Sequence, residues 1–403
     1  MAHVTRGSVS TWLVGVDAAN QLPGDGITIY RNWKATMFDP ARESGGVEAG
    51  SLPGAALPST ALPTTAIPAT EFNPSVGVAF FSALRSALSE RFSFFENGDI
   101  PVRICIPKIG NVTLAESRLA LVLGEAGLSS AVPRPTVFEP ESNALGILSR
   151  GNNTTWLPKP VDFMPWKGRE VDLPRMLDSA ELRSAFRHMR EYFGFLVIDI
   201  GSFTTDFGFV RFDTSFTSGD WNRPAIIQDS VALGIQDLDR MVKNSLSDQS
   251  RLAVEKLSTT QWDSLKSNLY QGQPVALPKS DGELLHVGAG DEGDAVREAI
   301  REFAEKVWSA RQQFCAAFIT DRVHSQCVTG GGSMIQGIKD LLAIHSAAEM
   351  ENNGDDFVKT MAPVYKRVSK HAAEGESLEA RARRDTQLVR GGSAIGGASV
   401  FFE

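Results

Sequence analysis

The segment FLVIDIGSFTTDFGFV, residues 195–210, joins an apolar run to a short turn rich in acidic and hydroxyl side chains. The apolar run predicts a strand that delivers Asp199. The turn follows directly and carries Gly201 and the polar residues Ser202, Thr204, Thr205 and Asp206. Glycine lets backbone come close to an anion, and successive amides in a tight turn can surround it. We expect the hydroxyls to donate to phosphate oxygens and the two aspartates to hold hydrated magnesium. A β-hairpin turn capped by Asp and Ser would explain the same residues, so this segment alone leaves both interpretations open.

A second segment, residues 325–342, runs from a predicted strand through three glycines into a predicted amphipathic helix. Gly330, Gly331 and Gly332 cost chain entropy, so we expect something to need close approach to this backbone. Adenosine lying over the turn, aided by amides at the helix start, is one explanation. A tight strand-to-helix turn is the other. The segment is neither a P-loop nor a dinucleotide fingerprint, because neither Gly-Lys-Ser/Thr nor G-x-G-x-x-G completes it.

Strands and helices must position these turns. Apolar runs predict strands at 11–16, 27–30, 101–106, 135–138, 195–200 and 325–329, and helical spacing predicts helices at 80–95, 114–126 and in much of 230–322. Their alternation predicts mixed α/β layers with helices on the sheet faces. Between about 45 and 75, prolines recur at 53, 58, 63 and 68, which predicts an extended or disordered insertion.

Composition excludes several classes of protein. The chain has 403 residues, enough for two lobes, and its 42% apolar and 22% charged residues are typical of globular proteins. The net charge of −8 argues against a chain that wraps nucleic acid. The N-terminus lacks the apolar stretch of a signal peptide, and no run approaches the ~20 apolar residues of a membrane span. The three cysteines lack metal-site spacing. We therefore expect a cytoplasmic protein with reduced thiols and no nucleic-acid or membrane partner.

The order of five segments resembles the actin-like ATPases, the superfamily of actins, sugar kinases and seventy-kilodalton heat-shock chaperones. The segments are a strand leading to Asp17, then EPESNALG, DIGSFTTD, VTGGGSMIQGI and VRGGSAIGGA. They are similar to the family's phosphate one, connector one, phosphate two, adenosine and connector two motifs. The resemblance is strongest to the nucleotide-binding domain of the chaperones, whose leucine-glycine segment is similar to ALGIQDLD here. DIGSFTTD and the Pro-Glu-Ser string also look like plasmid-partitioning bacterial actins. The likeness covers most of residues 11–30 and 100–400.

The resemblance implies an α/β fold of two actin-like lobes, the ribonuclease-H-like duplicated architecture, with a nucleotide cleft between the lobes. Residues 1–190 would form lobe I, interrupted by the proline-rich insertion at about 45–75. Residues 191–370 would form lobe II, and residues 371–403 would return to lobe I with connector two. The implied ligands are ATP or ADP together with Mg²⁺.

The resemblance also implies site residues. Asp17, Asp199 and Asp206 would face the metal. The remaining nucleotide-binding positions would be Ala18, Ala19, Asn20, Gly201, Ser202, Phe203, Thr204, Thr205, Gly234, Gly330, Gly331, Gly332 and Ser333. Asp199 would also take part in catalysis with a connector-one carboxylate that orients the attacking water. The heat-shock pattern points to Glu139 and the partitioning-actin pattern to Glu141. A helix sets them about 200° apart, so both cannot face the cleft equally, and we favour Glu139.

Two departures predict slow hydrolysis. Ala19 stands where phosphate one has glycine, and Phe203 stands where the chaperones have glycine in phosphate two. We expect no β-sandwich substrate-binding domain after connector two and therefore no full chaperone cycle. We expect an ATP-binding ATPase of low turnover, or a protein that only binds nucleotide, acting as a nucleotide-gated conformational switch with a protein partner or through self-association. The alternatives are a filament-forming actin-like protomer and a small-molecule kinase, although no sugar-binding aspartate can be identified for the kinase.

Overall fold

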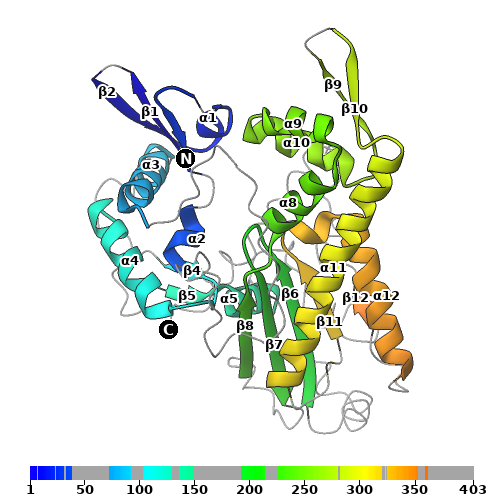
Figure 1. Ribbon diagram of the computed structural model, residues 1–403. Coiled ribbons are helices and arrows are strands. Elements are labelled where there is room, and N and C mark those ends of the chain that lie inside the picture. The colour runs from blue at the N-terminus through cyan, green and yellow to red at the C-terminus, as the bar shows by residue number, and fades with distance from the viewer. Residues whose placement is uncertain are drawn as a thin grey trace, which may run out of the picture. The chain divides into compact units, whose positions relative to one another are not determined.

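The computed structural model describes residues 1–6, 8–22, 24–30, 33–38, 72–91, 103–128, 136–148, 192–213, 225–279, 282–319, 323, 325–352 and 359–361. Residues 45–71 of the expected proline-rich insertion and the expected connector two lie outside these ranges. The chain is an α/β protein that divides into two compact units (Figure 1). Unit 1 comprises Met1–Arg103, Ile109–Thr136 and Lys243–Val296, and unit 2 comprises Ile104–Lys108, Val137–Val242 and Arg297–Glu403.

Unit 1 contains an antiparallel sheet of order β2-β1-β3, formed by β1 (Ala2–Arg6), β2 (Val9–Leu13) and β3 (Ile27–Ile29). The predicted strand at 11–16 ends earlier than expected. Gly15 has a φ of 65° and turns the chain into the short helix α1 (Val16–Ala19). Gly26 must be glycine, because a Cβ there would lie 2.4 Å from the carbonyl oxygen of Thr5.

The other elements of unit 1 are mainly helical: α2 (Trp33–Phe38), α3 (Pro74–Arg91), α4 (Val112–Glu125), α9 (Asp248–Glu255), α10 (Thr259–Leu269) and the hairpin of β9 (Val275–Pro278) and β10 (Leu284–Val287). Asn111 caps α4, where its side chain accepts the Leu114 amide, and Ser258 with Gln261 forms a capping box on α10. The predicted helices at 80–95 and 114–126 are confirmed with shifted ends. The β9–β10 hairpin was not predicted within the helical middle of the chain.

Unit 2 is built on a five-stranded sheet of order β12-β11-β6-β7-β8. Its strands are β6 (Tyr192–Ile200), β7 (Thr205–Asp213), β8 (Ala225–Val231), β11 (Ser325–Thr329) and β12 (Lys359–Met361). β6, β7 and β8 form an antiparallel meander, and β11 and β12 extend the sheet as strands parallel to β6. The strands predicted at 195–200 and 325–329 are confirmed. The described residues of unit 1 do not repeat this five-stranded sheet.

Helices cover both faces of the unit 2 sheet. α5 (Glu139–Leu148) packs on the face of Gly208, where an added Cβ would lie 2.7 Å from the Pro140 carbonyl oxygen. Phe207, the preceding residue of β7, points to the opposite face and stacks on Phe314 of α11 (Asp291–Phe318), with ring centroids 5.3 Å apart. α12 (Gln336–Asn352) lies beside α11 (Figure 1). The sheet is therefore the middle layer of three.

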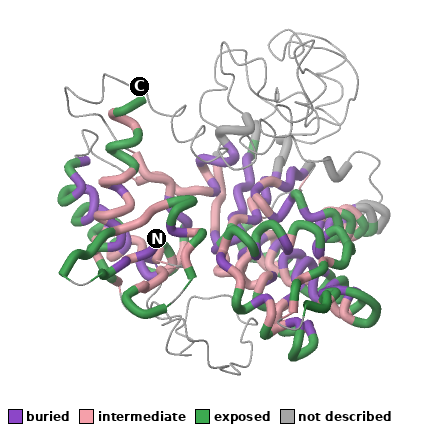
Figure 2. Tube along the Cα trace, turned by 90° about the horizontal axis from the view of Figure 1, so that it is seen from above, coloured by how far each residue is buried: buried purple, intermediate pink, exposed green. Residues whose placement is uncertain are grey.

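Apolar periodicity accounts for this layering. The fully buried side chains of unit 2 include Leu196, Ile198, Ile200, Phe207, Phe209, Phe303 and Phe314. Within the turns of the helices, buried residues on one side are followed by exposed residues on the other (Figure 2).

The remaining elements are the strands β4 (Ile104–Ile106) and β5 (Thr136–Phe138), α8 (Ile235–Ser245) and the 3₁₀ helix η4 (Gly331–Met334). None of the helices in the described part of the chain combines the length and apolar character needed to cross a bilayer.

The close packing of α5 on Gly208 predicts a stability effect. Gly208→Ala should lower the free energy of unfolding by roughly 1–3 kcal/mol, because backbone rather than a flexible side chain blocks the new methyl group. Gly124→Ala in α4 is the matched control, since an added Cβ meets nothing within 4 Å there. This control should gain about 0.5–1 kcal/mol from its exposed helical position. Urea unfolding measures both, and wild-type stability in Gly208→Ala would contradict the packing.

Candidate functional site

Two aspartates face each other at the turn between β6 and β7. Asp199 and Asp206 are direct partners across this antiparallel pair, so their side chains lie on the same face of the sheet. That face is the one covered by α5, because Gly208 of β7 contacts α5 and follows Asp206 by two residues. Asp206 is only 1% exposed and Asp199 is half-buried. Directly opposed like charges are destabilising, so the surroundings must supply hydrogen-bond donors.

Hydroxyl groups supply the donors for Asp206. Thr204 Oγ1 donates to Asp206 Oδ2 at 3.1 Å, and Ser230 Oγ of β8 donates to Oδ1. Ser230 in turn accepts the backbone N–H of Lys108 at 2.8 Å. Asp206 thereby links β7, β8 and the segment after β4. The neighbouring Asp229 has its pKa raised by burial, which the Ser230 backbone and the Lys108 charge partly offset.

Two elements hold the Asp199 carboxylate. The Asn143 side-chain amide of α5 donates to Asp199 Oδ2. On the other side, β11 runs parallel to β6 with Thr329 in register with Asp199, and Gly330 follows. Gly330 has a φ of 79°, and a Cβ on it would lie 2.0 Å from Asp199 Oδ1. The glycine turn therefore lies directly against this carboxylate.

Several polar groups of the expected phosphate loop already have hydrogen-bond partners within the protein. Thr205 is fully buried and its hydroxyl donates to the Leu233 carbonyl at 2.6 Å. The Gly201 amide donates to the Thr204 carbonyl at 2.8 Å, and Phe203 is buried. Ser202 is exposed, and its hydroxyl accepts from Gln236 of α8 at 3.2 Å. Ser202 is therefore a polar side chain that this loop presents outward, and Gln236 of α8 is bonded to it.

Gly234 supports the loop from the start of α8. A Cβ on Gly234 would lie 2.5 Å from the Ser202 carbonyl oxygen. The amides of Ile235 and Gln236 donate to the carbonyls of Gly201 and Ser202, each at 3.0 Å. Close packing of the loop on α8 thus explains this glycine without a ligand.

The three consecutive glycines have different reasons to be glycine. Gly330 is confined by Asp199, and a Cβ on Gly332 would lie 2.3 Å from the Ile200 side chain. An added Cβ on Gly331 meets nothing within 4 Å, and Gly331 is half-exposed. Ser333 is fully buried and its hydroxyl donates to the Gly330 carbonyl at 2.7 Å. Gly331 alone of the three leaves room for another molecule. The turn continues into η4, so α12 begins only at Gln336.

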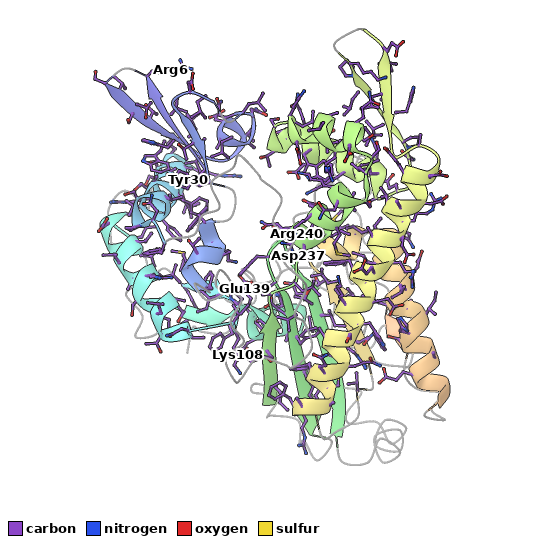
Figure 3. All side chains as sticks on the ribbon, in the orientation of Figure 1. Arg6, Tyr30, Lys108, Glu139, Asp237 and Arg240 are labelled. Carbon is purple, nitrogen blue, oxygen red and sulfur yellow. The ribbon has the colours of Figure 1, made fainter. Side chains whose placement is uncertain are left out.

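α5 carries the two candidate glutamates of connector one. Glu141 Oε2 accepts from the Gln228 amide of β8 at 3.4 Å. Glu139 is the first residue of α5 and lies toward the end of the sheet nearest α8, as Asp237 and Arg240 do (Figure 3). Asn143 is about 40° from Glu139 around the helix and about 160° from Glu141. The helix face that reaches Asp199 is therefore the face of Glu139.

The predicted phosphate-one residues lie in unit 1, in and just after α1. Asp17 and Asn20 are exposed, Ala18 is buried and Ala19 is half-buried. The Asn20 amide donates to the Val16 carbonyl at 3.0 Å, which closes the helical turn. The positions predicted from Glu139 to Ser333 belong to unit 2.

Sequence reasoning missed three polar residues of the site: Asn143, Ser230 and Gln236. Asn143 gives a sequence signal in retrospect, because it is a polar residue four positions after Glu139 and so lies on the same face of a helix. Ser230 gives no such signal, since its role depends on the register between β7 and β8. Among the described residues, no group of three or more His, Cys, Asp or Glu side chains is arranged to hold a metal. No protein-family model matches the chain, and no curated protein matches it either.

The contrast between adjacent glycines can be tested by stability. Gly330→Ala should cost roughly 1–3 kcal/mol, because its φ is positive and the new Cβ collides with Asp199 and with the Ile200 carbonyl. Gly331→Ala should stay within about 0.5 kcal/mol of wild type, since its surroundings are open. Urea unfolding of the two variants in parallel measures this difference. Equal costs would contradict the geometry of the turn.

Proposed function

We propose that the chain is an ATP-binding protein of the actin-like superfamily that hydrolyses ATP slowly and acts as a nucleotide-gated conformational switch. The observation that carries the proposal is the contact between the Asp199 carboxylate and the turn of Gly330, Gly331 and Gly332. It brings together the two segments whose residue types favour a phosphate-metal site and an adenosine site.

The topology of the unit 2 sheet supports this location. From β6 the chain adds β7 and β8 on one side, whereas β11 and β12 lie on the other side. The order of the strands therefore reverses between the parallel neighbours β6 and β11. In open α/β sheets, ligands bind outside the carboxyl ends of strands at such a switch point. Asp199 and Gly330 stand at these two strand ends. A meander extended by parallel strands also supports a ribonuclease-H-like lobe.

The residues at the switch point fit a magnesium nucleotide. Mg²⁺ usually keeps several waters and takes one or two carboxylates, so the half-buried Asp199 suffices as a protein ligand. Asp206 would support Asp199 from the neighbouring strand. Ser202 offers an exposed hydroxyl, and the open space at Gly331 would accept adenosine close to the backbone. When bound, magnesium would supply charge neutralisation for the phosphates.

Hydrolysis would need a residue that orients water. Glu139 shares the helix face of Asn143, which contacts Asp199. Glu141 instead bonds to Gln228. The geometry of α5 therefore supports the choice of Glu139. Slow turnover follows from Ala19 and from the buried Phe203, which occupy positions where the family has glycine.

Calorimetry with ATP in magnesium buffer tests the proposed function directly. The wild type should bind, and Gly331→Val should lose at least about tenfold in affinity, or about 1.4 kcal/mol, because the new side chain fills the open space. Gly124→Ala controls for an unrelated glycine, and unfolding curves confirm that Gly331→Val is folded. Absence of ATP binding by wild type would overturn the proposal. ATP-dependent light scattering would instead favour the filament protomer.

A second experiment assigns the water-orienting residue. Glu139→Gln keeps the shape of the side chain and removes its charge, so turnover should fall roughly 10²–10⁴-fold while ATP affinity stays nearly constant. Glu141→Gln is the matched control from the same helix and should retain turnover. A sensitive phosphate assay measures both, with Gly331→Val purified in parallel to reveal contaminating ATPases. Loss of turnover in Glu141→Gln alone would transfer the role to Glu141.

A further inference from the structure

Asn143 is a polar side chain at a position where α5 otherwise buries small groups. It is 2% exposed, and Ala144 and Ser142 beside it are 0% and 1% exposed. Burying an amide is unfavourable unless it finds a hydrogen-bond partner, so packing alone disfavours asparagine here. Its side-chain N–H donates to Asp199 Oδ2, so this buried amide is paired with a carboxylate.

A side-chain amide is a suitable hydrogen-bond donor for a carboxylate that binds a cation. Asparagine donates a hydrogen bond to the ionised oxygen but brings no positive charge of its own. Lysine or arginine at the same place would make a charge-assisted pair and offset the negative charge. With Asn143 as the donor, the contact orients Asp199 and preserves its charge.

Two contacts fix where Asp199 can point, and close packing of α5 on the sheet makes the first of them possible. Asn143 approaches Oδ2 from α5, and the backbone of Gly330 lies against Oδ1. Gly208 lets α5 come close to the sheet, with an added Cβ only 2.7 Å from Pro140 O and 3.4 Å from the Ala144 side chain. A short side chain such as asparagine can reach Asp199 only because α5 lies this near.

We propose that Asn143 is a positioning residue that orients Asp199 toward the cation accompanying the nucleotide. This inference rests on the proposed function and deepens it, because it assigns a role at Asp199 to a further polar residue of α5. The role is distinct from water orientation, which belongs to Glu139. Loss of Asn143 should therefore weaken the contribution of magnesium to binding, rather than nucleotide binding in general.

The first test compares ATP affinity with magnesium and with EDTA. In Asn143→Leu, affinity in magnesium should fall roughly 10–100-fold, the usual loss when a residue supporting a metal ligand is removed, while affinity in EDTA should stay within about twofold. Asn143→Ala removes the amide donor without adding bulk or charge and should show the same selective loss if Asn143→Leu does not fold. Ser142→Ala, the adjacent buried residue, is the control and should match wild type. Equal losses in magnesium and EDTA would mean a structural role only and would overturn the inference.

A double-mutant cycle asks whether Asn143 acts through Asp199. Once Asp199→Asn has removed the charge, adding Asn143→Leu should not further change the ratio of the two affinities. Independent, additive effects on that ratio would overturn the assignment.

A third readout needs no nucleotide, so the proposed function and this inference can fail separately. In protein labelled with ¹⁵N-asparagine, the Asn143 side-chain amide signal is identified by its loss in Asn143→Leu. Asp199→Asn should shift this signal in the free protein, and Mg²⁺ alone should also shift it. Glu141→Gln, on the other side of α5, should not. If wild type binds no ATP, the proposed function falls. A signal unmoved by Asp199→Asn would overturn the Asn143 assignment whatever the ATP result.

Discussion

The opposition of Asp199 and Asp206 across one pair of strands is the constraint on which the surrounding structure depends. Two carboxylates on one partly buried face repel each other unless neutral donors or a cation stabilise them. Asn143 donates a hydrogen bond to Asp199, and Thr204 and Ser230 donate to Asp206. These donors come from a helix, a turn and a neighbouring strand. The position of α5 and the register of β8 are therefore tied to two negative charges.

The glycines around the site follow from the same constraint. Gly208 has no side chain because α5 must come close enough for Asn143 to reach its acceptor. Gly330 has none because the Asp199 carboxylate occupies the space where a Cβ would be. Glycine in both places costs chain entropy, which the close packing of helix, strand and turn offsets. Gly331 differs from both, since in the described part of the chain an added Cβ there would meet nothing within 4 Å. An unexplained glycine beside an oriented carboxylate is the feature that most supports a ligand there.

A nucleotide switch needs a site that a ligand can complete. The turn after β6 is closed by the hydrogen bond from the Gly201 amide to the Thr204 carbonyl and is held to the segment after β8 by the bond from Thr205 to Leu233. Rigid positioning of this kind reduces the entropy lost on binding. The start of α8 is bonded to the same turn through Ile235 and Gln236, so movement of the turn and of α8 would be coupled. This coupling is a physical route by which occupancy at the strand ends could reach the rest of the chain.

The sequence by itself determined the strands β6 and β11, the helices α3 and α4 apart from their ends, and the presence of acidic and glycine-rich turns after these strands. Hydrophobic periodicity and turn chemistry are local properties of the chain, so they could be predicted. The sequence did not determine that the Thr205 and Ser333 side chains point inward or that Gly330 and Gly332 are glycines because of internal packing. Nor did it determine that Asn143 reaches Asp199. Only the tertiary structure decided these points. A side chain's partner depends on strand register and on the distance between layers, and the residues that set both lie far apart in the chain.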